Sequence, residues 1–191
     1  MKFSSDIDID FGSRSSILKH ITHIPASIDP KTAHNTGIYV TKIPQDPATG
    51  RASLDYRSAE QRGYVKLDFL NVGIYSQIQS ESQLISLMNQ EPPWARLYES
   101  KFCEQLIHIG NHYSTLRRMP EPVDSITRLA MFLAVIRPAK RHLIGQTWAE
   151  VAKTIWEKSA DEYYFKRAHG IAYAHLVVVH MNLLNLTHQG N

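Results

Sequence analysis

Residues 6–11 alternate aspartate with apolar side chains in the order Asp-Ile-Asp-Ile-Asp-Phe. Successive side chains of a β-strand point to opposite faces, so this pattern predicts a strand that buries its isoleucines and gathers Asp6, Asp8 and Asp10 on the other face. Two carboxylates about 5 Å apart repel each other by roughly 3 kcal/mol at an effective dielectric constant near 20. We therefore expect a positive charge beside this face.

A second carboxylate, Asp68, follows within the strand-like residues 65–70. Clustered carboxylate oxygens suit Mg²⁺ or Mn²⁺, and a pair of such ions can hold the attacking and leaving oxygens of a phosphoryl transfer. Lys66 lies two residues before Asp68, hence on the same strand face, where it can meet a triphosphate oxygen. Solvated strand edges and calcium loops also carry Asp-x-Asp-x-Asp, but the glycine and distal glutamate of an EF-hand are missing here.

The order of five segments resembles the palm and fingers of the bacterial replicative DNA polymerase III α subunit, the C family of DNA polymerases. The first segment is similar to a Pro-Asp-x-Asp-x-Asp-Phe strand, with Ser5 in place of proline, and the third to Val-Lys-Phe-Asp-Phe-Leu-Gly. The second is similar to a His-Ala-Gly-Gly-Val turn, the fourth to Arg-Pro-Gly and the last to Phe-Asn-Lys-Ser-His-x-x-Ala-Tyr-Ala. In order, these segments are residues 5–11, 34–40, 65–70, 136–139 and 165–174.

The resemblance implies site residues position by position. It implies that Asp8, Asp10 and Asp68 are catalytic and bind two Mg²⁺ or Mn²⁺ ions. Ala139 replaces the last glycine of Arg-Pro-Gly, and Arg167 replaces a lysine, so the fourth and fifth segments depart from the family pattern. The nucleotide-binding residues that we expect from the resemblance and the local charge are Lys66, Arg137, Lys166, Arg167, His169 and Tyr173.

The resemblance also implies an activity and partners. We expect a DNA-directed DNA polymerase that acts on primer-template DNA and dNTPs in a bacterial or phage-infected cytoplasm, without a membrane. Between the aspartate strand and the histidine turn, the family carries a long insertion that includes the thumb. This chain has only residues 12–33 between those two segments. A processivity protein or a complementary polymerase protein is therefore an expected partner. The alternatives are a non-catalytic DNA-binding or regulatory remnant and one piece of a split polymerase, of viral origin.

Length and charge fit one domain or two small lobes, since 191 residues with 43% hydrophobic side chains can bury a substantial core. Residues 1–95 hold nine Lys/Arg against ten Asp/Glu, and residues 96–191 hold twelve against eight. The carboxyl half is thus the basic half, and basic residues supply sequence-independent affinity for DNA. From this half we predict four nucleic-acid contacts: Arg117, Arg118, Lys140 and Arg141.

Periodicity predicts an α+β fold, with a small mixed sheet in residues 1–82 and a helical part in residues 83–191. The resemblance implies that the sheet is of the polymerase palm type and that the helical part is fingers-like. We expect Asp124 to be the N-cap of one helix, and Thr147 with Glu150 to form a capping box at another. The expected strands are residues 6–11, 37–43 and 65–70. The expected helices are residues 15–21, 84–88, 94–116, 126–136, 148–158 and 169–186.

Three other features indicate more ordinary roles. Cys103 is the only cysteine, which excludes an intramolecular disulfide, and its apolar neighbours favour a core position. His108 and His112 have the spacing of a zinc-binding helix but lack the glutamate of that motif, so we do not assign zinc. The apolar residues 171–186 contain histidine and asparagine, which favours a buried helix over a membrane span, and no secretory signal is visible near the amino terminus.

Overall fold

The structure, a computed structural model, describes residues 6–158 and 165–189. The fold is α+β, and the chain divides into two compact units, residues 1–79 and 80–191. This boundary lies three residues before the one expected from the sequence.

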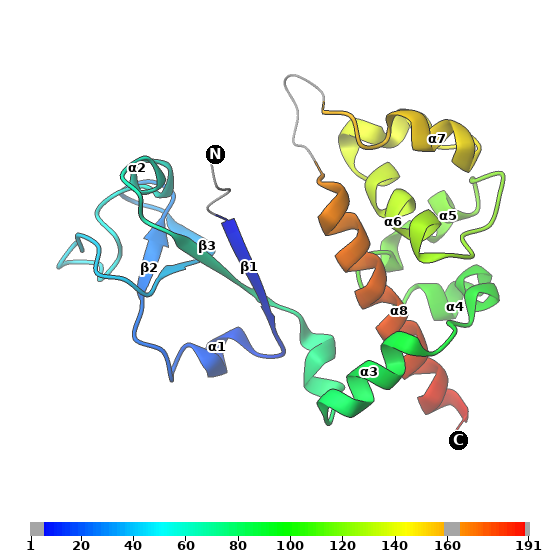
Figure 1. Cartoon of the computed structure of the whole chain (residues 1–191), viewed down its shortest axis with the longest axis horizontal. Coiled ribbons are helices and arrows are strands. Elements are labelled where there is room, and N and C mark those ends of the chain that lie inside the picture. Colours follow the sequence, from blue (N-terminus) through cyan, green and yellow to red (C-terminus); the bar gives the residue numbers. More distant parts are fainter. Residues whose placement is uncertain (1–5, 159–164, 190–191) are drawn as a thin grey trace. The chain divides into compact units, whose positions relative to one another are not determined.

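The first unit contains a mixed four-stranded sheet in the order β1-β4-β3-β2 (Figure 1). β1 pairs parallel with β4, whereas β3 is antiparallel to both β4 and β2. The strands are β1 (Asp6–Phe11), β2 (Ile24–Ser27), β3 (Ala33–Tyr39) and β4 (Lys66–Asn71). The helices of this unit are α1 (Arg14–Ile17), α2 (Tyr56–Gln61) and the 3₁₀ helix η1 (Gly73–Gln77).

The two faces of this sheet differ in what they bury. One face lies over a small core of Ala26, Tyr39, Ile43, Ala52 and Ala59, the last of which comes from α2. On the other face the rings of Phe11 and Phe69 lie 4.8 Å apart between centroids. The expectation that β1 buries its isoleucines is wrong for Ile7, which is 47% exposed, because β1 is an edge strand with a neighbour on one side only.

Several boundaries in the first unit differ from the expected ones. The expected helix at residues 15–21 is the single turn α1. The strand expected at residues 37–43 is β3, which begins four residues earlier and contains most of residues 34–40, for which the resemblance implied a turn. β2 is not among the strands expected from the sequence; its Pro25 suits an edge strand because that position needs no second ladder bond. Nor is α2 among the expected helices; Asp55 caps it by accepting hydrogen bonds from Arg57 N and Ser58 N, each at 3.0 Å.

The second unit is helical, and its centre is α6, which packs against α8 and α7 (Figure 1). Seven consecutive residues of α6 are buried, so this helix is covered on all sides, as is typical of a core helix. The α-helices are α3 (Glu81–Asn89), α4 (Ser100–Cys103), α5 (Tyr113–Leu116), α6 (Ile126–Val135), α7 (Trp148–Thr154) and α8 (Arg167–Gln189). The 3₁₀ helices are η2 (Trp94–Tyr98), η3 (Gly110–His112) and η4 (Pro138–Leu143).

The continuous helix expected at residues 94–116 is wrong. The segment is broken into η2, α4, η3 and α5, with an irregular stretch in the middle. His108 there has a φ of 64°, which no right-handed helix contains. Gly110 packs so closely that a Cβ atom would lie 2.6 Å from the carbonyl oxygen of Glu104. Apolar periodicity indicated the buried face of this segment, but it did not indicate where the helix is interrupted.

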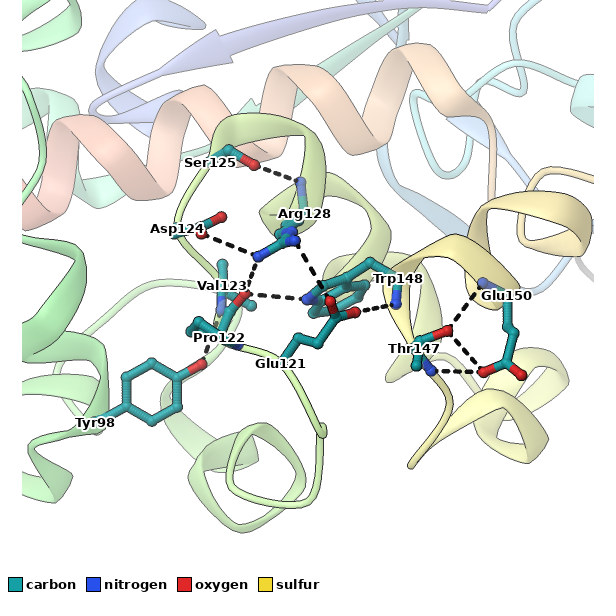
Figure 2. A network of polar contacts seen from close by, with 10 residues as sticks. All are labelled: Tyr98, Glu121, Pro122, Val123, Asp124, Ser125, Arg128, Thr147, Trp148 and Glu150. Atoms are coloured by element: carbon teal, nitrogen blue, oxygen red, sulfur yellow. Dashed lines mark hydrogen bonds and ion pairs between the residues drawn. The ribbon is translucent and has the colours of Figure 1, made fainter.

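Polar contacts fix the starts of α6 and α7 to the loop that precedes α6 (Figure 2). The Ser125 hydroxyl accepts from Arg128 N, so Ser125 is the N-cap of α6, and the prediction of Asp124 is wrong. Asp124 instead accepts from Arg128 Nη1 at 3.0 Å. Glu121 accepts from Trp148 N at 2.8 Å, at the start of α7. The capping box of Thr147 and Glu150 is confirmed.

The last helix, α8, is a core helix of the second unit. By length and composition it is the one helix among the described residues that could cross a membrane, yet 50% of its most apolar stretch is buried inside the unit. Its Ala174, Val178 and Met181 belong to the main core, which also contains the buried Cys103, as expected. His180 within it accepts a hydrogen bond from Ile107 N at 3.1 Å.

Candidate functional site

The strand register places Asp8 beside Asp68. In the parallel pair of β1 and β4, Asp8 is opposite Asp68, and Asp10 lies two residues further along the same face. Neighbouring strands are about 4.8 Å apart, and residues opposite each other in a ladder project to the same side of the sheet. The two segments that supply the predicted carboxylates therefore meet at one edge of the first unit.

The predicted carboxylates differ in their exposure to solvent. Asp8 and Asp10 are exposed on the edge strand, whereas Asp68 is buried and 7% exposed. The side chain of Asp6 lies outside the described residues. The site thus combines one buried acid with two acids open to solvent.

Asp68 has a partner on each oxygen. Its Oδ2 forms an ion pair with Lys66 Nζ, and its Oδ1 accepts a hydrogen bond from Thr36 Oγ1 at 2.8 Å. Both Lys66 and Asp68 are at least 90% buried, so their attraction is screened little by water. Lys66 supplies part of the positive charge that the sequence analysis expected beside the aspartates.

The Lys66 side chain runs along the face of the sheet over Gly37, where the absence of a side chain leaves room for it. A Cβ atom on Gly37 would lie 2.8 Å from Lys66 Cδ and 3.0 Å from His34 Nδ1. The ammonium group then lies 5.8 Å from the centroid of the Tyr56 ring, at the start of α2. Glycine at position 37 is therefore part of the site, because a side chain there would displace Lys66.

His34 supports the strand that carries Thr36. Its Nδ1 accepts hydrogen bonds from Gly37 N at 2.9 Å and from Thr36 N at 3.3 Å. A nitrogen that accepts from two N–H groups carries no proton, so the 3.7 Å approach of His34 Nδ1 to Asp68 Oδ1 is not an ion pair. The ring also meets Tyr56 edge-on at 5.4 Å. Thr36 and Tyr56 are not among the site residues predicted from the sequence, because no local motif marks them.

The field of these acids reaches Tyr39, which lies on β3. Burial, followed by the negative charges of Asp55, Asp68 and Glu60, raises the pKa of Tyr39 to about 12. The Tyr39 hydroxyl is buried without a hydrogen-bond partner among the described residues. It therefore stays protonated at neutral pH.

The donor set fits a hard divalent cation in chemistry, since carboxylate oxygens are its preferred ligands. Asp8, Asp10 and Asp68 could hold one, and each oxygen of Asp68 keeps a lone pair beyond the hydrogen bond that it accepts. Among residues 6–158 and 165–189, however, no three His, Cys, Asp or Glu side chains are gathered as a metal site. Binding would thus require the acids to draw closer together and Lys66 to shift.

Three of the expected nucleotide-binding residues of the second unit lie in an aromatic cluster with Phe165: Arg137, His169 and Tyr173. The Arg137 guanidinium lies 4.8 Å from the centroid of Phe165, and the Phe165 ring is 6.1 Å from that of Tyr173. His169 stacks on Tyr173 at 6.0 Å. Lys166 and Arg167 are exposed at the start of α8, close in sequence to this cluster.

The residues predicted to contact nucleic acid fall into two groups. Arg117 and Arg118 are exposed at the end of α5, and the Arg117 guanidinium lies 6.0 Å from the centroid of Tyr98. Lys140 instead donates to the carbonyl oxygens of Thr154 and Glu157 at 2.8 and 3.0 Å, which ties η4 to the end of α7. Arg141 is exposed, and its Nε donates to Ile136 O at 3.4 Å.

Comparison of the chain with protein families, with curated proteins and with solved structures gave no match.

Proposed function

We propose that the chain is the core of a DNA-directed DNA polymerase, with the first unit in the role of the palm and the second in that of the fingers. In this reaction the primer 3′-hydroxyl oxygen bonds to the α-phosphorus of a dNTP, the bond to the β-phosphate oxygen breaks, and pyrophosphate leaves. The single observation that carries the proposal is the register of Asp8 against Asp68, with Asp10 on the same face.

In this proposal Asp8, Asp10 and Asp68 hold two Mg²⁺ or Mn²⁺ ions, which would activate the hydroxyl and neutralise phosphate charge. Lys66 pairs with Asp68, and its ammonium group could exchange that carboxylate for an oxygen of a bound phosphate. In the second unit, the cationic and aromatic residues proposed to bind the triphosphate and the nascent base pair form a separate group. They are Arg137, Lys166, Arg167, His169 and Tyr173.

The proposed DNA contacts rest on charge. Arg117, Arg118 and Arg141 are exposed and can reach backbone phosphates, whereas Lys140 contributes mainly to the fold. Only α1 and β2 lie between β1 and β3, so no thumb is inserted there. We therefore expect weak binding to primer-template DNA at physiological salt and the addition of one or a few nucleotides per encounter, unless a partner protein is present.

Primer extension with Mg²⁺ or Mn²⁺ tests the proposal, using Asp8→Asn and Asp10→Asn. These two acids are exposed, so their loss should leave the fold intact, whereas Asp68→Asn would strip the buried Lys66 of its counter-ion and destabilise the unit by about 3 to 5 kcal/mol. Both exposed-acid variants should lose at least about a hundredfold in incorporation rate while keeping DNA affinity. Asp29→Asn, an exposed turn residue, is the matched control.

A second candidate function is that of a non-catalytic DNA-binding protein. The observation that favours it is that Lys66 and Thr36 already satisfy Asp68. In that case wild-type protein would bind DNA without incorporation under any metal condition, and the two asparagine variants would behave like the wild type. Incorporation that appears only with a companion protein would instead identify one piece of a split polymerase.

A further inference from the structure

His108 is held in an unusual backbone conformation. Its φ of 64° is the one positive φ of a non-glycine residue in the described chain. This conformation is costly for most side chains, and such positions cluster at ligand sites. The imidazole stacks on Tyr173, with 4.5 Å between ring centroids and 25° between planes. The fold therefore maintains a strained residue next to the aromatic cluster of Arg137, Phe165 and Tyr173.

Two polar nitrogen atoms, one of His108 and one of this cluster, have no hydrogen-bond partner among the described residues. His108 Nε2 and Arg137 Nε are both buried and make no hydrogen bond. The guanidinium of Arg137 rests on Phe165, and no carboxylate of the described residues forms an ion pair with it. Buried polar atoms in native proteins are nearly always paired, so this pair calls for an acceptor beyond the described residues, and a bound ligand can supply it.

The charges around the cluster define the acceptor. Burial and the positive charge of Arg137 lower the pKa of His108. Burial, Arg141 and Arg137 do the same to the pKa of His112. The local potential is thus positive, and a ligand with several negatively charged acceptor oxygens would satisfy both the charge and the open donors.

We propose that His108 is a ligand-binding residue, which together with Arg137 donates hydrogen bonds to the phosphate oxygens of a nucleotide beside the Tyr173 ring. The assignment of the phosphate to a nucleotide rests on the proposed function. The anion site itself stands on the contacts of the second unit.

Inorganic pyrophosphate is the probe, titrated into the full chain by calorimetry in EDTA at low salt. His108→Asn tests the ring, because asparagine tolerates a left-handed backbone but cannot reach as far. Arg137→Lys keeps the charge and loses the Nε donor. Each change should weaken pyrophosphate binding by about tenfold or more. His142→Asn, an exposed histidine of η4, should change it less than about twofold.

The variant His108→Gly distinguishes ligand binding by His108 from a purely structural role. Glycine adopts a positive φ without strain, so this variant keeps the loop conformation while it removes the ring. The proposal expects the folded variant, checked by circular dichroism, to lose pyrophosphate affinity as His108→Asn does. It also expects pyrophosphate to raise the melting temperature of the wild type and not that of either variant.

Two results would overturn the proposal: wild-type protein that does not bind millimolar pyrophosphate, or His108 variants that bind it as well as the wild type does. Neither result bears on Asp8 and Asp10, so primer extension that depends on those acids would stand without it. Conversely, pyrophosphate binding through His108 in a protein that never extends a primer would retain the anion site and reject the polymerase.

Discussion

Gly37 is the residue on which the surroundings of Asp68 depend. It lies opposite Asp68 in the antiparallel pair of β3 and β4, and its missing side chain leaves the path that Lys66 follows. A buried ion pair needs good geometry to offset the loss of water from both charges. Because Gly37 carries a hydrogen atom where alanine would carry a methyl group, Lys66 can reach the carboxylate of Asp68.

Gly37→Ala should destabilise the first unit by about 1 to 3 kcal/mol, because the new methyl group would meet Lys66, His34 and Ala26 at 2.8 to 3.1 Å. Amide hydrogen exchange in β3 and β4 measures the change locally, as faster exchange. Gly73→Ala, where a Cβ atom meets nothing within 4 Å, is the control and should leave exchange unchanged. Equal exchange in wild type and Gly37→Ala would mean that Lys66 moves aside without cost.

At the scale of elements, the start of a helix depends on a single side chain that accepts a hydrogen bond from a backbone amide of that helix. Ser125 caps α6 and Thr147 caps α7, each by accepting from the amide three residues ahead. Asp124 precedes the cap and pairs with the partly exposed Arg128. Capping residues contribute more than such surface ion pairs because they satisfy amides that otherwise lack a partner.

Ser125→Ala should therefore lower the free energy of unfolding of the second unit by about 1 kcal/mol, and Asp124→Ala by less than about half of that. The three tryptophans, Trp94, Trp148 and Trp156, all lie in this unit, so tryptophan fluorescence in urea follows its unfolding alone. A larger loss in Asp124→Ala than in Ser125→Ala would contradict the assignment of the cap.

At the scale of the whole molecule, the buried histidines of the second unit couple its stability to pH. Three partly buried histidines, His108, His112 and His180, lie in the second unit, and burial is the main cause that lowers the pKa of each below 6.5. Above pH 6.5 these side chains are neutral in both the folded and the unfolded chain. Below it the unfolded chain takes up protons first, so the unfolded state is favoured.

The second unit should keep its full stability above pH 6.5 and lose stability as the pH falls through that value. Urea midpoints from tryptophan fluorescence at pH 8.0, 7.0, 6.0 and 5.5 measure this, with an unchanged slope m. His180→Gln should reduce the dependence on pH because it removes one of the three groups. A midpoint that stays constant down to pH 5.5 would contradict the expected uptake of protons.

Local patterns in the sequence determined the features that a few neighbouring residues control. The alternation of residues 6–11 defined β1 with its observed bounds, and the Thr147–Glu150 pattern defined the start of α7. Hydrophobic periodicity located α6 and α8 to within a few residues. These features are local because their hydrogen bonds and side-chain directions repeat within one strand or one helical turn.

Tertiary structure decided the rest. Asp8 and Asp68 are 60 positions apart, and only the pairing of β1 with β4 sets them in register. The choice of Lys66 and Thr36 as partners of Asp68, and the break of residues 94–116 at His108, depend on close packing with distant segments. Periodicity carries no information on such contacts, because many partners can cover the same apolar face, and the best fit of side chains selects one.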